Sequence, residues 1–302
     1  MFRLLTNHGC PDVTSWLDFR TCSSYPVSNG GYGDVFRARF FNGDEVAIKT
    51  MRVYESHHSG GRYAKAAARE IYTWSRCSHP NVAELIGIVI FRGSLAMISR
   101  WAQKGNIMAY LDRRPSANRC QMSLEICNGL AYLHDQNIVH GDLKGANVLM
   151  ANNGTPVLVD FGNATISGAT LQFTRSTDTG PSFSTRWTAP EILKGESGHT
   201  KAADVYSLGM TILEVLTGKV PYANVHELAL IVHIVFKSSV PIRPLEVIPE
   251  NSVFGNILWA MLTSCWTHNP KQRPTADDVR YMMNRVHRSG LVSVTSGTEN
   301  GE

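Results

Sequence analysis

The first third of the chain has the apolar and turn-forming pattern of β-structure. Residues 25–50 contain β-branched and aromatic residues around Val35 and Ala47, interrupted by Asn29-Gly30-Gly31 and Asn42-Gly43. Asn-Gly pairs favour tight hairpin turns, so we expect two antiparallel strands around the second turn, the later one ending at Lys49.

An alanine-rich segment and two further strands follow. The alanines after Ser59-Gly60-Gly61 favour a helix, which His79-Pro80-Asn81 ends. Strands are expected at residues 85–91 and 95–101, with Arg92-Gly93-Ser94 as the turn between them.

From residue 106 onward the spacing of apolar residues is mainly helical. Four apolar residues follow one another at intervals of four, four and three positions: Met122, Ile126, Leu130 and Leu133. This spacing places them on one face of a helix. Later helices are expected at residues 203–216, 226–236, 254–266 and 275–287, and short strands at 147–150 and 156–159. This order predicts an α+β fold of two lobes, with a hinge near residues 101–103.

Composition narrows the class of protein. The chain has 302 residues, of which 43% are hydrophobic and 18% charged, and this excludes a disordered chain. The net charge of +4 is spread out, so nucleic acid is not an expected partner. The longest apolar stretch, residues 228–236, is far shorter than the ~20 residues of a membrane span. Six cysteines without Cys-x-x-Cys pairs predict reduced thiols in a cytoplasmic protein, with a nuclear location as the alternative.

The first candidate site is the glycine-rich segment SNGGYGDV, residues 28–35. Glycines let a backbone approach phosphate oxygens closely, although an ordinary glycine hairpin has the same composition. Lys49 follows in an apolar strand, where an unpaired ammonium is costly to bury, and Glu70 follows in the predicted helix. The two residues form an ion pair that aims Lys49 at phosphates, or they are a solvent-facing lysine and an unrelated carboxylate.

Two further motifs decide between these alternatives. VHGDLKGANVL, residues 139–149, contains a carboxylate that could orient a hydroxyl (Asp142), a cation (Lys144) and an amide ligand for a hard metal ion (Asn147). VLVDFGNA places Asp160 directly after an apolar strand, where a carboxylate could hold Mg²⁺ against a nucleotide. Both motifs in this order are hard to explain by chance.

With these motifs in this order, the sequence resembles the eukaryotic protein kinases over residues 25–287. The resemblance continues in RWTAPE with Glu191, DVYSLG with Asp204 and NPKQRPT with Arg273. It implies a buried pair between Glu191 and Arg273. Lys144 and the tryptophan before TAPE are similar to the tyrosine-kinase-like serine/threonine kinases, and HGDLKGANVL resembles the expanded kinase families of mushroom-forming fungi.

The resemblance implies a two-lobed kinase fold with a five-stranded small lobe that carries one main helix. We expect an N-terminal extension at residues 1–20 and a kinase domain at 21–288, divided into lobes of residues 21–102 and 103–288. Residues 289–302 are expected to form a flexible tail.

The resemblance also implies roles for individual residues. Adenine would lie between Val27, Val35, Ala47 and Leu149, beside the hinge backbone at Arg100 and Ala102 and the gatekeeper Ser99. The phosphates would lie under Gly30, Gly31, Tyr32 and Gly33 and contact Lys49, which Glu70 would orient. Asn147 and Asp160 would bind Mg²⁺, Asp142 would be the catalytic base, and Ser184 would bond to Asp142 and Lys144.

Two positions depart from the family pattern. Ser28 replaces the first glycine of the phosphate loop, and Gly141 replaces an arginine that often neutralises a phosphate on the activation loop. We therefore hypothesise that activity depends little on phosphorylation of that loop, within residues 163–185.

The sequence as a whole predicts an ATP- and Mg²⁺-dependent serine/threonine protein kinase acting on protein substrates, as a monomer or weak dimer. Two alternatives remain open. A pseudokinase would bind nucleotide or partners without turnover, and a small-molecule phosphotransferase is disfavoured by the TAPE and DVYSLG segments.

Overall fold

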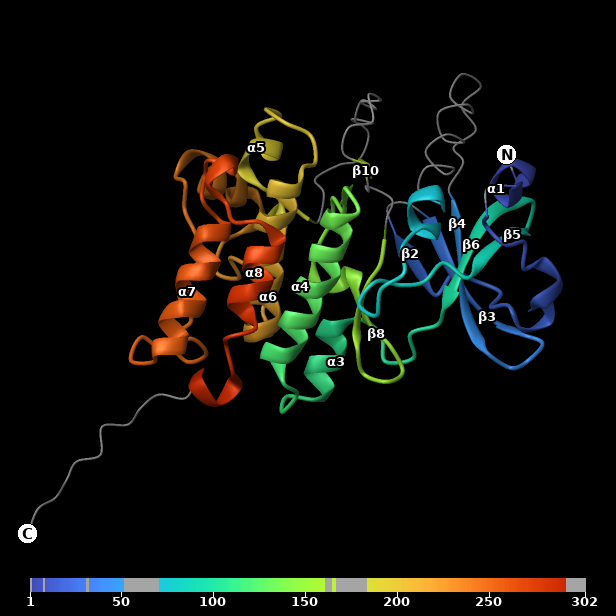
Figure 1. Ribbon diagram of the computed structural model, residues 1–302, viewed down its shortest axis with the longest axis horizontal. Coiled ribbons are helices and arrows are strands. Elements are labelled where there is room, and N and C mark those ends of the chain that lie inside the picture. Colours follow the sequence, from blue (N-terminus) through green and yellow to red (C-terminus); the bar gives the residue numbers. More distant parts are fainter. Residues whose placement is uncertain are drawn as a thin grey trace, which may run out of the picture.

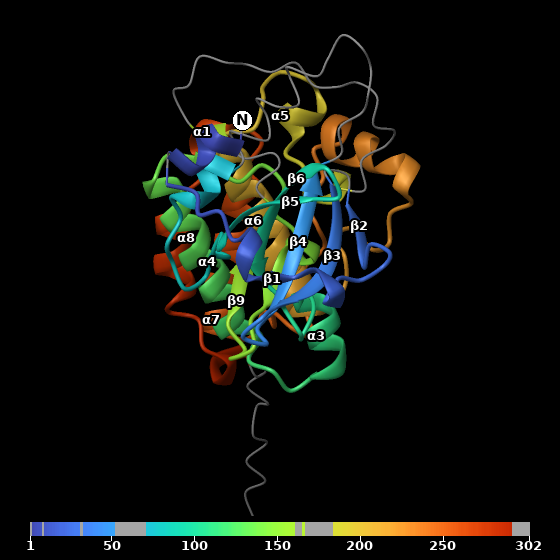
Figure 2. The same ribbon diagram turned by 90° about the vertical axis from the view of Figure 1, so that its right-hand side faces the viewer.

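The computed structural model describes residues 2–7, 9–30, 33–51, 71–160, 165–166 and 184–291. The small lobe is built on an antiparallel sheet, seen to the right in Figure 1 and facing the viewer in Figure 2. Its strands are β1 (Leu17–Asp18), β2 (Ser28–Gly30), β3 (Gly33–Phe40), β4 (Glu45–Met51), β5 (Gly87–Phe91) and β6 (Ser94–Arg100). They follow the order β1-β3-β4-β6-β5, with β2 paired to β3. The five-stranded lobe is thus confirmed, with the short β1 as an addition.

Strand β4 shows how the sequence places the site. Val46 and Ile48 are buried in an apolar cluster on one face of the sheet. Because successive side chains in a strand point to opposite faces, Glu45, Ala47 and Lys49 lie on the other face. One strand therefore presents a carboxylate, a small residue and an ammonium in a row.

The segment before the sheet packs onto it. Val13 and Leu17 belong to the same buried cluster as Val46, and the amide of Val13 donates to the carbonyl of Ile88 over 3.1 Å. The approach is close, because a Cβ at Gly87 would lie 2.5 Å from the carbonyl oxygen of Pro11. Val13 and Leu17, which lie within the predicted N-terminal extension, therefore pack against the sheet of the small lobe.

Beyond the hinge the chain forms a mostly helical lobe, to the left in Figure 1. Its α-helices are α3 (Ile107–Arg113), α4 (Arg119–Asp135), α5 (Pro190–Leu193), α6 (Lys201–Thr217), α7 (Val253–Cys265) and α8 (Ala276–Met283). Its short strands are β7 (Ile138–Val139), β8 (Val148–Met150), β9 (Pro156–Leu158) and β10 (Thr165–Ile166). The four apolar residues that were predicted to share one helix face all lie in α4 and are buried there: Met122, Ile126, Leu130 and Leu133. Residues 226–236, predicted as one helix, include a 3₁₀ turn at Glu227–Ala229 and a π-helical turn at Val232–Phe236.

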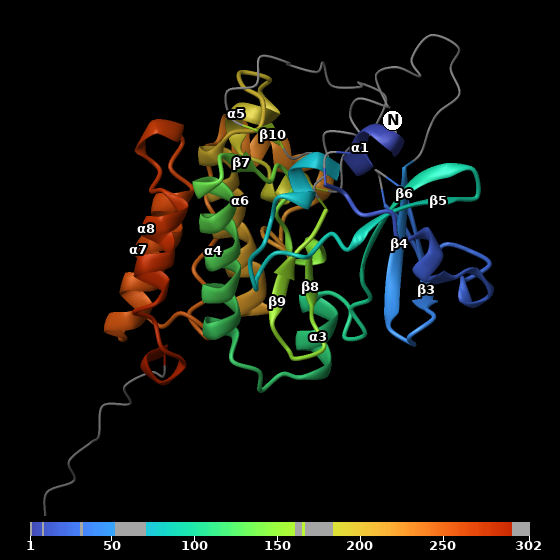
Figure 3. The same cartoon turned by 45° about the vertical axis from the view of Figure 1, so that its right-hand side comes forward.

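Helices α4 and α6 form the centre of this lobe, and Figure 3 shows α4 beside α8 on one side and β8 and β9 on the other. Ile126 and Leu130 of α4 and Leu208 and Ile212 of α6 belong to one continuous buried cluster. Leu143, in the loop between β7 and β8, belongs to the same cluster, so the loop packs directly on this core. Among the described helices, none combines the length and apolar character needed to cross a bilayer.

Candidate active site

The loop between β7 and β8 holds three of the predicted site residues together. Lys144 Nζ lies 2.8 Å from Oδ2 of Asp142 and 2.6 Å from Oγ of Ser184. Both side chains of the Asp142–Lys144 pair are largely shielded from solvent. Of the two contacts predicted for Ser184, the one with Lys144 is confirmed, and it joins the loop to the start of the RWTAPE segment.

Asn147 contacts the same carboxylate. Its Nδ2 donates to the backbone oxygen of Asp142 over 2.8 Å and to Oδ2 over 3.0 Å. Two donors, Lys144 Nζ and Asn147 Nδ2, thus fix one oxygen of Asp142. No described residue donates to the other oxygen, Oδ1, so it remains able to accept a proton or a hydrogen bond from a substrate.

A buried carboxylate on α6, that of Asp204, accepts hydrogen bonds from the loop between β7 and β8. Its Oδ2 accepts a hydrogen bond from the amide of His140 over 2.7 Å, and its Oδ1 accepts one from the amide of Gly141 over 2.9 Å. Oδ2 also lies 2.9 Å from Nε2 of His134. Burial raises the pKa of Asp204, but the hydrogen bond and charge of His134, the charge of His140 and the Gly141 amide together hold it below its usual value. An ionised Asp204 therefore anchors the residues just before Asp142.

Lys49 and Asp160 meet across the two lobes. Lys49 Nζ lies 2.8 Å from Oδ1 of Asp160, and both side chains are partly buried. Asp160 has a left-handed backbone with φ 71°, a conformation that aspartate tolerates better than most residues and that is frequent at functional sites.

The residue before Asp160 links this pair to the loop. Val159 donates its amide to the backbone oxygen of Asn147 over 3.0 Å, and its own carbonyl lies 3.1 Å from Nε2 of His140. Through these bonds Asp160 is held in a fixed relation to the Asp142 loop.

Part of the predicted adenine site lines one pocket along the hinge. This pocket, of about 420 Å³, includes Ser99, Arg100, Ala102 and Leu149, but most of its remaining lining comes from residues within 79–84 and 151–159. Val27, Val35 and Ala47 do not line it, but Val27 donates its amide to Val35 over 2.8 Å, and Ala47 is opposite Ser99 in the sheet register. Gly30 and Gly33 face each other at the β2–β3 turn.

Other predicted residues lie outside the described part of the chain. Glu70, Gly31 and Tyr32 are among them, so the predicted Lys49–Glu70 pair stays a prediction. The same holds for most of the predicted activation loop, residues 163–185.

The predicted buried pair is confirmed. Arg273 donates from Nη1 and Nη2 to the two carboxylate oxygens of Glu191, each over 2.7 Å, and its guanidinium also lies over the ring of Tyr206. Such a two-point contact fixes geometry as well as charge. It ties the RWTAPE segment to the end of the large lobe.

The sequence did not identify one further acid in this region. Glu214 of α6 is buried and accepts, through Oε2, the amide of Gly145 and the indole Nε1–H of Trp187, each over 2.9 Å. Burial raises the pKa of Glu214 to about 7, although these two hydrogen bonds and the charge of Lys144 oppose the shift. The only sequence signal was a carboxylate within the mostly apolar second half of α6.

Comparisons with known proteins agree with this geometry. A family model of the protein kinase domain matches residues 25–283. The chain is 30% identical over 259 residues to serine/threonine-protein kinase STY46 of Arabidopsis thaliana, covering 84% of this chain and 42% of the relative. It is 27% identical over 273 residues to serine/threonine-protein kinase CTR1 of the same plant, covering 88% of this chain and 31% of the relative.

A third relative comes from a different organism. Identity to mitogen-activated protein kinase kinase kinase A of Dictyostelium discoideum is 28% over 261 residues, covering 84% of this chain and 26% of that protein. The chain thus spans less than half the length of these relatives. Since the family model covers most of the sequence and its motif residues converge on one site, the chain belongs to the protein kinase family.

Proposed function

We propose that this protein transfers the γ-phosphoryl group of ATP to serine or threonine hydroxyls of protein substrates. The observation that carries the proposal is the arrangement of Asp142, Lys144 and Asn147. One carboxylate oxygen of Asp142 accepts from both neighbours, and no residue in the described part of the chain donates to the other oxygen. The names of the relatives support the serine/threonine assignment. The tyrosine-kinase-like group is supported by Lys144 and by the tryptophan before TAPE. The narrower resemblance to fungal kinases stays a prediction.

In the proposed step, Asp142 orients the substrate hydroxyl and receives its proton. The hydroxyl oxygen forms a bond to the γ-phosphorus while the bond from that phosphorus to the bridging oxygen of ADP breaks. Lys144, 2.8 Å from Asp142, adds positive charge beside the transferring group. Catalysis of this kind depends mainly on positioning and on neutralising phosphoryl charge, because the protein forms no covalent bond.

Lys49 and Asp160 are proposed to bind the nucleotide, Lys49 directly and Asp160 through Mg²⁺. Lys49 would bind the α- and β-phosphates, and its contact with Asp160 brings it next to a proposed metal ligand. Carboxylate and amide oxygens are the ligands that Mg²⁺ prefers. Asn147 donates through Nδ2 to Asp142, and among the described residues none donates to its side-chain oxygen, which could therefore serve as such a ligand. When bound, Mg²⁺ would neutralise phosphate charge.

The remaining proposed contacts are those of the adenine ring and of the phosphates. Adenine would lie among Val27, Val35, Ala47 and Leu149 and bond to the backbone of Arg100 and Ala102, with Ser99 as gatekeeper. Gly30, Gly31, Tyr32 and Gly33 would cover the phosphates, with Glu70 orienting Lys49. The domain limits, the cytoplasmic or nuclear location, the monomeric or weakly dimeric state and the absence of a nucleic-acid partner remain part of this proposal.

The pseudokinase alternative makes the opposite prediction for turnover. Purified protein incubated with γ-labelled ATP, Mg²⁺ and a generic protein substrate should label serine and threonine. The Asp142→Asn variant should lose at least about 10²-fold in rate while still binding nucleotide. Nucleotide binding by the wild type with no labelling above that of Asp142→Asn would favour the pseudokinase.

A further inference from the structure

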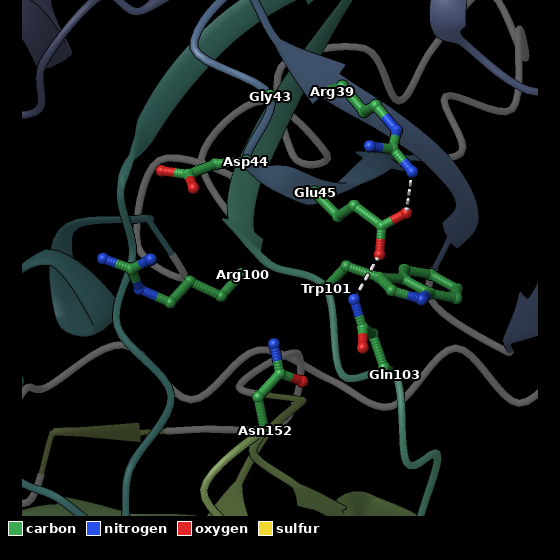
Figure 4. A pocket seen from close by; sticks show the side chains of 8 residues that line it. All are labelled: Arg39, Gly43, Asp44, Glu45, Arg100, Trp101, Gln103 and Asn152. Atoms are coloured by element: carbon green, nitrogen blue, oxygen red, sulfur yellow. Dashed lines mark hydrogen bonds and ion pairs between the residues drawn. The ribbon is translucent and has the colours of Figure 1, made fainter.

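A second pocket, of about 240 Å³, lies beside the hinge and is drawn in Figure 4. Arg39, Glu45 and Gln103 line it, and hydrogen bonds join them and the nearby Arg37 into a set of four residues that we call the hinge clamp. Arg37 and Arg39 belong to β3, Glu45 begins β4, and Gln103 lies in the hinge. The hinge clamp thus connects the small lobe directly to the segment between the lobes.

Glu45 is the centre of the hinge clamp. Its Oε1 accepts from Arg37 and, over 2.7 Å, from Arg39, while its Oε2 accepts from Nε2 of Gln103 over 2.7 Å. The side chain of Glu45 is only 9% exposed although both arginines are about half exposed. The hydrogen bonds from Arg37 and then from Gln103 lower the pKa of Glu45, so it is ionised at neutral pH.

Backbone and ring contacts act in the same place. The amide of Trp101 donates to the carbonyl of Glu45 over 3.0 Å, which extends the β4–β6 ladder into the hinge. The guanidinium of Arg37 lies 5.4 Å from the centre of the Trp101 ring. Glu45 therefore holds the hinge with both its backbone and its side chain.

We infer that Glu45 is a positioning residue that fixes the hinge for adenine binding. The inference rests on the proposed function, because the backbone proposed to bond adenine lies at Arg100 and Ala102. Glu45, Ala47 and Lys49 share one face of β4, so the same strand anchors the hinge at one end and carries the phosphate-binding lysine at the other. Loosening the hinge should weaken nucleotide binding while leaving the Asp142 site intact.

The experiment compares Glu45→Ala and Gln103→Ala with a matched control, Asp44→Asn. Asp44 precedes Glu45 on the same turn, and its carboxylate bonds to the side chain of its neighbour Asn42. Nucleotide affinity is measured by calorimetry with ATP, transfer is measured as kcat and KM, and hydrogen exchange is measured at the Trp101 amide in the free protein.

Each test variant should raise the Kd and KM for ATP about five- to tenfold, as expected for loss of a charge-assisted hydrogen bond, with kcat nearly unchanged. Exchange at Trp101 should become faster in both variants and remain unchanged in Asp44→Asn. In the double variant the effects on Kd should be less than additive, since both changes break one contact. Glu45→Gln, which keeps an acceptor for Gln103, should recover part of the affinity.

Unchanged exchange in both variants would overturn the inference, as would faster exchange with unaltered ATP affinity. A fall in kcat with unchanged KM would also contradict it, because the residue would then act on the chemical step. If the wild type neither binds ATP nor transfers phosphate, the proposed function fails. The nucleotide part of the inference fails with it, and hydrogen exchange then decides only whether Glu45 holds the hinge.

Discussion

Gly141 donates its backbone amide to Oδ1 of Asp204 over 2.9 Å, from a left-handed conformation with φ 82°. Together with the amide of His140, this bond fixes the chain immediately before Asp142. Glycine adopts such a backbone without the steric cost that a Cβ imposes. The glycine that replaces the family's usual arginine therefore suits the conformation that the loop has here.

A methyl group added at position 141 should destabilise the folded protein. Gly141→Ala should lose about 1–2 kcal/mol of unfolding free energy, because an L-residue at this φ crowds the following carbonyl. For a domain of this size the change corresponds to a melting temperature lower by about 2–6 °C. Gly198→Ala is the control, since its Cβ would meet open space at an ordinary φ. Equal melting temperatures for the two variants would show that position 141 is unstrained.

Lys144 is expected to act in the chemical step. Lys144→Ala removes the donor that lies 2.8 Å from Asp142 and 2.6 Å from Ser184, so kcat should fall about 10²–10⁴-fold with little change in the KM for ATP. Ser184→Ala should have a smaller effect in the same direction. Lys194→Ala, a lysine beside Glu196 on the large lobe, should be neutral. A main effect on KM would assign Lys144 to binding.

The sequence predicted those parts of the site whose residues lie close together in the chain. Asp142, Lys144 and Asn147 fall within six residues, so their spacing alone constrains how they can meet. The Lys49–Asp160 contact could be predicted only from the order of the motifs, because the two residues are 111 positions apart in the sequence.

The supports of the site could not be predicted in the same way. Asp204, Glu214 and Glu45 each accept donors from another element, and periodicity does not indicate which amide or indole a buried carboxylate will meet. The two-residue strand β1 was missed for a related reason, since its pairing with β3 is decided by tertiary packing.

The Glu191–Arg273 pair should be essential for stability. Arg273 has 0% side-chain exposure and Glu191 has 7%, so removing one partner leaves a buried charge without compensation. Arg273→Met should cost about 3–5 kcal/mol in chemical denaturation. The exposed Asp277–Arg280 pair is the control, and Asp277→Asn should change stability by less than about 1 kcal/mol. Similar values for both pairs would contradict the role given to burial.

Glu214 should make stability depend on pH. Its pKa is about 7 in the folded protein against an ordinary value of 4.5, so the folded state holds the proton more tightly than the unfolded state. The resulting stabilisation is complete below about pH 4.5 and is lost as the pH rises through 7. The full difference is on the order of 3 kcal/mol, at ~1.4 kcal/mol per unit of pKa.

Glu214→Gln tests this expectation, because the amide oxygen can still accept from Gly145 and Trp187 but does not titrate. Urea unfolding at several pH values between 5.5 and 8.5 should show wild-type stability falling relative to the variant as pH rises. Asp278→Asn provides the comparison, since the pKa of Asp278 is lowered by its capping contacts with Thr275 and its stabilisation is lost only in acid. Parallel curves for wild type and Glu214→Gln across this range would mean that Glu214 is ionised throughout, and that its two donors outweigh the cost of burial.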